Sequence, residues 1–129
     1  MGGERDLRKR TKDFALRVIR LYGSLPKKTE AQVMGKQVLR SGTSVGAHYR
    51  EATRARSPAE FISKMEGGLQ ELDETCYWFD LLAESGIVPE ARLADLRQEA
   101  EELTAIFVSS VKTAKTRRKT QNAERQAQH

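Results

Sequence analysis

The chain has 129 residues, of which 38% are hydrophobic and 32% charged, a balance typical of one water-soluble domain with a modest core. No apolar run approaches the ~20 residues of a membrane-spanning helix, and the first ten residues lack the apolar stretch of a signal peptide. We therefore expect a cytoplasmic protein with no membrane contact. The single cysteine, Cys76, excludes an intramolecular disulfide and a cysteine metal cluster.

Charge is distributed unevenly along the chain. Residues 1–56 hold fourteen Lys and Arg against five Asp and Glu, residues 57–111 hold three against twelve, and residues 112–129 hold six against one. The sequence therefore consists of a basic half, an acidic half and a basic tail, with a formal net charge of +5.

Three prolines divide the chain into four segments of helical length: Pro26, Pro58 and Pro89. In the first segment, apolar residues recur at spacings of three, four and seven, which predicts an amphipathic helix that ends at Gly23. The residues of this apolar face are Leu7, Phe14, Ala15, Val18, Ile19 and Tyr22.

The second helix is predicted to begin at Thr29, whose hydroxyl would cap it with Gln32 as partner. It continues through Gly35, Gly42 and Gly46, and each glycine costs roughly 1 kcal/mol relative to alanine within a helix. We expect a close helix–helix contact to compensate, because a Cβ would not fit at such a contact.

The stretch 57–60 reads SPAE and marks the start of the third helix. Ser57 would cap this helix, Pro58 suits the first helical position, and Glu60 would reach back to the cap amide. An apolar face with aromatic residues follows, and the helix is expected to end near Gly86.

A fourth helix is predicted to begin at Pro89 or Glu90 and to keep its apolar period as far as Val111. We therefore assign residues 1–115 to a four-helix domain and residues 116–129 to a basic, disordered tail. Four helices with short connections predict an all-α fold, an antiparallel up-and-down four-helix bundle. The alternative is a three-helix bundle with an additional terminal helix.

Several residues of the second and third predicted helices form a recognisable set: Arg40-Ser41, Ser44, Glu51, the turn from Arg54 to Glu60 with Phe61, then Glu71, Asp73, Glu74, Tyr77 and Trp78. With them, about residues 6–115 resemble the four-helix-bundle proteins encoded in intervening sequences of 23S ribosomal RNA genes. His48 stands where that family more often has Asn. The resemblance implies an antiparallel four-helix bundle that assembles as a homopentamer. A related protein, the accessory protein of diversity-generating retroelements, is a basic ring that works with a reverse transcriptase and nucleic acid, which suggests similar partners here.

Charged residues flank the small residues of the second helix and face carboxylates on the third. We predict a partly buried network of ion pairs and hydrogen bonds between these helices, which would fix their register more than it adds stability. The expected members are Arg40, Ser44, His48, Arg50, Glu51, Glu71 and Glu74. The alternative is ordinary solvated surface charge.

His48, the only internal histidine, could act as a general base oriented by Glu51 or Glu74. We favour a packed, hydrogen-bonded histidine, because no nucleophile or second internal histidine accompanies it. The sequence contains no Glu-x-x-His pair of the kind that holds metals in helical bundles, and Cys76 lies in an apolar period where an inert thiol is usual. We therefore expect no enzyme, no cofactor and no metal.

Basic residues of the first helix and of the end of the fourth would meet at one end of an antiparallel bundle. Such a patch could bind RNA or DNA through phosphates, without sequence preference and more weakly as salt rises. The expected contacts are Arg8, Lys9, Arg17, Arg20, Lys112, Lys115, Arg117, Arg118 and Lys119. We thus expect a homo-oligomeric, nucleic-acid-binding accessory or scaffold protein. The alternatives are a merely solvated basic surface and a protein–protein adaptor with no nucleic-acid role.

Overall fold

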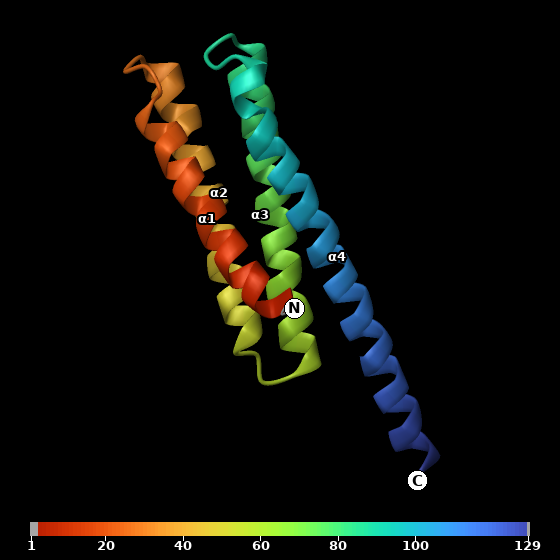
Figure 1. Ribbon diagram of the computed structural model, residues 1–129. Coiled ribbons are helices and arrows are strands. Elements are labelled where there is room, and N and C mark those ends of the chain that lie inside the picture. Colours follow the sequence, from red (N-terminus) through yellow and green to blue (C-terminus); the bar gives the residue numbers. More distant parts are fainter. Residues whose placement is uncertain (1–2, 129) are drawn as a thin grey trace.

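The computed structural model describes the backbone of residues 3–128 and the side chains of residues 7–128. Four helices account for nearly all of it, and no strand occurs in this range: α1 (Gly3–Gly23), α2 (Thr29–Thr53), α3 (Pro58–Glu84) and α4 (Glu90–Ala127). Short turns join successive helices, so each runs antiparallel to the one before it (Figure 1). The predicted all-α four-helix bundle is confirmed. None of these four helices is long and apolar enough to cross a membrane.

Helices that follow one another in the chain pack against one another. The α2 helix lies against both α1 and α3, and α4 lies along α3, whereas the contact between α1 and α4 is the least extensive. In Figure 1, α4 diverges from α1 and α2 toward its C-terminal end and projects beyond the turn between α2 and α3. We call the end of the bundle at the α2–α3 turn, where α4 leaves the other helices, the open end.

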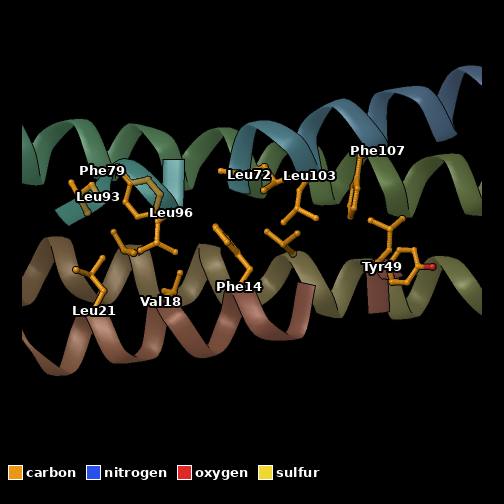
Figure 2. Packing of buried hydrophobic residues seen from close by; sticks show 14 of the residues in the cluster. Phe14, Val18, Leu21, Tyr49, Leu72, Phe79, Leu93, Leu96, Leu103 and Phe107 are labelled. Carbon is orange, nitrogen blue, oxygen red and sulfur yellow. The ribbon is translucent and has the colours of Figure 1, made fainter. Parts of the chain in front are cut away.

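The core runs between the helices as a continuous row of apolar side chains (Figure 2). Phe14 of α1, Leu72 and Phe79 of α3, and Leu103 and Phe107 of α4 are all fully buried. Each such side chain contributes about 1.5–3 kcal/mol to folding by leaving water. The core therefore joins all four helices.

The inward face of α1 differs in part from the predicted one. Phe14 and Val18 are buried as expected, but Ile19 is 46% exposed, and Thr11 and Leu21 are buried instead. The buried positions advance alternately by three and four residues, which leaves Ile19 beside the core stripe. Thr11 is tolerated inside because its hydroxyl donates a 2.7 Å hydrogen bond to a carbonyl one turn earlier in α1.

The start of α2 differs from the expected cap. Lys28 occupies the cap position without a side-chain hydrogen bond, and Thr29 is already the first helical residue. The Gln32 side chain is engaged elsewhere, because it donates to the Pro26 carbonyl at 2.8 Å and accepts from the Tyr22 hydroxyl at 3.0 Å. Gln32 therefore fastens the α1–α2 turn instead of serving a cap.

The start of α3 follows the sequence closely. The Ser57 hydroxyl accepts from the Glu60 amide at 3.1 Å, and proline occupies the first turn. The Glu60 carboxylate accepts from the amide of Arg56 at 2.6 Å, one residue before the cap amide that the pattern predicted. The helix ends at Glu84, followed by Gly86 at a positive φ of 80°, a conformation that favours glycine.

Glycines of α2 line its contact with α1. A Cβ on Gly42 would lie 2.8 Å from a methyl carbon of the buried Val18, and one on Gly46 would lie 3.2 Å from the hydroxyl oxygen of Thr11. The expected close approach of two helix backbones is therefore present, and α1 is the partner.

The end of α4 differs from the expected frayed tail. The helix continues to Ala127, although every residue from 115 to 128 is exposed. Residues 112–127 thus form a basic helical extension of about 24 Å at 1.5 Å per residue. We call these residues the α4 extension. The outermost residues of the two expected segments, 1, 2 and 129, lie outside the described residues.

Candidate functional site

A polar cluster joins α2 to α3 around Arg40. Its guanidinium lies 2.6 Å from the Glu74 carboxylate and 3.4 Å from that of Glu71. The Trp78 indole N–H also points to Glu74, at 3.4 Å. The hydrogen bond from Arg40 lowers the pKa of Glu74, so this carboxylate stays ionised to more acidic pH than an isolated glutamate.

His48 lies on the inner side of the same cluster. Its Nε2 is 3.8 Å from a carboxylate oxygen of Glu71, beyond hydrogen-bond distance. The imidazole fills the space over Gly67, where a Cβ would come within 2.7 Å of the ring. His48 Nδ1 and Glu71 Oε1 are buried and make no hydrogen bond within the described residues. The histidine is therefore a packed side chain beside a carboxylate.

Three other expected members of the network lie outside this cluster. The Ser44 hydroxyl donates to the backbone carbonyl of Arg40 at 2.7 Å. Glu51 pairs with Lys64 of α3 at 3.2 Å, at an exposed position. Arg50 lines hollows on the α1 side of α2. It follows His48 by two positions, and residues two positions apart point to nearly opposite sides of a helix. The structure thus brings together Arg40, His48, Glu71 and Glu74 and leaves out Ser44, Arg50 and Glu51.

A buried hydrogen bond between α2 and α3 was not expected. Thr75 Oγ1 donates to Ser41 Oγ at 2.8 Å, and Ser41 donates in turn to the Gln37 carbonyl at 2.9 Å. Both hydroxyl-bearing residues are fully buried. The signal in the sequence was a polar residue on the apolar face of each helix, three or four residues from its apolar neighbours.

Arg10 is the second connection that sequence reasoning missed. It joins α1 to α4, with its guanidinium 2.7 Å from the Glu99 carboxylate and 2.8 Å from that of Glu102. The hydrogen bond to Glu99 is the main cause that raises the pKa of Arg10. The two ion pairs thus join the two helices whose mutual contact is the least extensive.

The described residues offer little for catalysis. No group of three or more His, Cys, Asp and Glu side chains in this part of the chain is placed to hold a metal ion. Burial raises the pKa of the Cys76 thiol, which favours the unreactive protonated form. His48 packs over Gly67 and lies 3.8 Å from the Glu71 carboxylate, as a histidine with a structural role would.

The expected nucleic-acid contacts fall on separate surfaces. Arg8 and Lys9 lie at the start of α1, whereas Arg17 and Arg20 border a hollow with Arg92 at the other end of the bundle. The remaining five expected contacts lie on the α4 extension: Lys112, Lys115, Arg117, Arg118 and Lys119. Arg17 and Arg20 therefore lie away from the α4 extension, whereas Arg8 and Lys9 lie at the same end of the bundle as its base.

The cations of the α4 extension are exposed, and most lack acidic partners. Lys115 pairs with Glu66 of α3 at 3.2 Å. Lys112, Arg118 and Lys119 form no ion pair with the described residues. This segment therefore presents positive charge on several sides of a helix that only partly touches the bundle.

Apolar grooves border the base of the same extension. One, of about 690 Å³, lies between the start of α3 and α4 and is lined by Phe61, Ile106, Ala114 and Arg117, among others. A second, of about 550 Å³, reaches from Phe61 to Leu7 and Tyr49 at the open end of the bundle. The open end thus combines apolar walls with a basic rim.

The comparisons with known proteins decide the family. Residues 4–109 match the model of a protein family that is described as "23S rRNA-intervening sequence protein". The chain belongs to this family. No match is found among curated proteins. The match to the 23S rRNA-intervening sequence proteins does not indicate an enzymatic family.

A solved structure supports the same placement. It is a protein described as of unknown function from the S23 ribosomal protein family of Bacteroides thetaiotaomicron VPI-5482. The likeness has a TM-score of 0.80 at 35% sequence identity and covers 84% of this chain and 97% of that chain. The family match ends at residue 109, so the α4 extension lies beyond the part of this 23S rRNA-intervening sequence protein that defines the family.

Proposed function

We propose that the protein is a non-enzymatic accessory or scaffold protein that binds nucleic acid through phosphates. The observation that carries this proposal is the α4 extension. Residues 112–129 hold six Lys and Arg against one Glu, and the helix that bears them projects past the bundle. Because residues 115–128 are exposed, the cations of this segment are accessible to a ligand in solution.

The mode of binding follows from the chemistry of these side chains. Each Lys or Arg that neutralises a phosphate releases a condensed counterion, so affinity falls as salt rises. No exposed aromatic residue lies on the extension to stack on a base. The contacts are therefore with the backbone of RNA or DNA and carry no sequence preference.

We also propose that the protein acts as a homo-oligomer in the cytoplasm, with a pentamer as the assembly that the family resemblance implies. The charge distribution supports self-association. Residues 1–56, which contain α1 and α2, are strongly basic, and residues 57–111, with α3 and most of α4, are equally acidic. Where part of the basic surface of one copy meets the acidic surface of the next, the contact is head-to-tail, and it forms a ring when the rotation between copies closes. A protein partner such as a reverse transcriptase is proposed on the resemblance alone.

The test is binding of a short labelled RNA, followed by fluorescence anisotropy at several salt concentrations. We expect the wild type to bind, with a logarithmic salt slope that reports the number of phosphates. The variant Arg117→Gln/Arg118→Gln/Lys119→Gln should bind more weakly, and its slope should fall by about 0.7 for each phosphate that is no longer neutralised. A wild type that binds no RNA even at low salt contradicts the proposal.

The matched control is Lys27→Gln/Lys28→Gln/Lys36→Gln. These three lysines are exposed and lie at the far end of the bundle, near the α1–α2 turn. The control removes the same charge from the same chain. If it weakens binding as much as the α4 variant, net charge and not the extension carries the affinity.

A protein–protein adaptor remains the second candidate, favoured by the apolar grooves at the open end. The groove residue Phe61 is only partly buried, and together the two grooves exceed 1000 Å³, large enough for side chains of a partner helix. Phe61→Ala would then abolish capture of a protein partner and leave RNA affinity unchanged. The nucleic-acid proposal predicts instead that charge variants in the α4 extension weaken RNA binding.

A further inference from the structure

A shallow groove follows the seam between α1 and α2. Its floor is made of small residues, and its volume is about 270 Å³. Ala15 lies on the α1 side, and Thr43, Gly46 and Ala47 lie on the α2 side. The two helix backbones approach closely here, and no large side chain covers the seam between them.

Cations line the rim of this groove. Lys12 and Arg50 border it, and both also border an adjoining hollow of about 330 Å³ with Arg8, Lys9 and Asp13. The two hollows therefore adjoin each other at these two side chains. We call them together the α1–α2 cationic groove, rimmed by Arg8, Lys12 and Arg50.

Three cations of the groove have no ion-pair partner among the side chains that the structure describes. Lys9 and Asp13 pair with each other at 2.8 Å. Arg8, Lys12 and Arg50 are exposed and form no ion pair with any side chain among residues 7–128. Three like charges along one seam repel one another, and an anion that lies between them removes that repulsion.

The arrangement follows from two antiparallel helices. Arg8, Lys12 and Ala15 recur at spacings of four and three on α1, and Thr43, Ala47 and Arg50 do so on α2 in the opposite direction. Arg50 thereby comes to lie near the start of α1. Arg10 lies on the other side of α1, against α4, so the groove faces away from the α4 contact.

The groove suits an extended polyanion better than a small ion. Its three cations are all exposed, and a single exposed ion pair contributes little in water. Several phosphates on one chain are needed to bind such a surface tightly. Arginine can hold a phosphate with two hydrogen bonds, and lysine can hold one as a point charge. No aromatic side chain lines the seam, so bases would face away.

We propose that the α1–α2 cationic groove binds the phosphodiester backbone of a nucleic acid, as a second contact separate from the α4 extension. The inference rests on the proposed function and names a site for it that lies within the matched family region. Arg8, Lys12 and Arg50 hold successive phosphates, and the small floor lets the backbone lie close to both helices.

The test compares RNA binding of the wild type with Arg8→Gln/Lys12→Gln/Arg50→Gln. Glutamine keeps good helix propensity and removes only charge, so circular dichroism should match the wild type. We expect the affinity to fall at least tenfold at moderate salt and the logarithmic salt slope to fall by about 2, since three phosphates are no longer neutralised. The control Lys27→Gln/Lys28→Gln/Lys36→Gln should change both much less.

A second readout does not depend on net charge. RNA added to isotopically labelled protein should shift the backbone amide signals of Thr43, Gly46 and Ala47, which line the floor. If the wild type binds RNA but neither these signals nor the triple variant responds beyond the control, the groove inference is overturned and the proposed function stands. If the wild type binds no RNA, the proposed function itself fails.

Competitors identify the polyanion. Unlabelled single-stranded RNA and DNA should displace the labelled RNA, since both carry the phosphodiester backbone. If phosphatidylserine vesicles or inorganic polyphosphate bind through Arg8, Lys12 and Arg50 and nucleic acids do not displace them, the surface serves a membrane or a polyphosphate, and the nucleic-acid inference is wrong.

Discussion

The contact between Gly42 and Val18 predicts a measurable coupling between α2 and α1. A Cβ on Gly42 would lie 2.8 and 2.9 Å from the two methyl carbons of Val18, which is fully buried. Valine is stiff within a helix, so it cannot rotate away from the added methyl group. We expect Gly42→Ala to introduce strain of about 1–3 kcal/mol, against a gain in helix propensity of roughly 1 kcal/mol.

Removing the Val18 methyl groups should reverse the sign of this effect. Val18→Ala alone should lower the free energy of unfolding by about 1.5–3 kcal/mol, because less apolar surface is buried. In that background, the two closest methyl groups are gone and the added Cβ meets only the Cβ of residue 18, at 3.2 Å, so Gly42→Ala should raise the free energy of unfolding by up to about 1 kcal/mol. The coupling energy of the double-mutant cycle is then about 1–3 kcal/mol.

Urea unfolding followed by circular dichroism measures the four proteins, at one chain concentration because self-association would add to stability. Gly23→Ala is the control, since a Cβ there meets nothing within 4 Å. If Gly42→Ala stabilises the wild type as much as the Val18→Ala variant, the seam is not tightly packed and the reasoning is wrong.

Three further predictions concern charges and the α4 extension. Arg10→Met should lower the free energy of unfolding by roughly 1 kcal/mol in urea titrations, because the part-buried Glu99 loses its hydrogen bonds. The lowered pKa of Glu74 means that its bond to Arg40 stabilises the fold above the unfolded pKa, about 4.3, and that this stability is lost as pH falls through the folded pKa. The stability difference between wild type and Arg40→Met should therefore shrink on acidification from neutral pH, and a constant difference would contradict it. Removal of residues 115–129 should change the melting temperature little, because residues 115–128 are exposed, while lowering helical signal and RNA affinity.

Much of the fold was predictable because its signals are local. The cap at Ser57 and the proline beside it depend on neighbours within one helical turn, and both hold in the structure. The glycines of α2 predicted a close contact because their cost within a helix needs compensation. The family resemblance implied the same architecture independently, and the family match over residues 4–109 confirms the resemblance.

The orientation of side chains around each helix was harder to predict. Ile19 is more exposed than expected and Thr11 is buried. The burial of Thr11 depends on a hydrogen bond from its hydroxyl to a backbone carbonyl, which composition does not reveal. The surroundings of Arg50 and the partner of Glu51 also depend on which side of α2 each side chain takes. Long-range pairs such as Arg10 with Glu99 join residues 89 positions apart, and charge alone does not choose among many carboxylates.

The α4 extension has a consequence for how the protein responds to its surroundings. An isolated helix of this length is only marginally stable, because its first turn is costly to form. Here the packed part of α4 supplies that first turn, so helix propagates outward residue by residue. Lys115 and Lys119 stand one turn apart, and like charges at this spacing weaken a helix by about 0.2–0.5 kcal/mol. Salt or bound phosphates relieve that repulsion. The number of helical residues in the α4 extension therefore depends on the ionic environment.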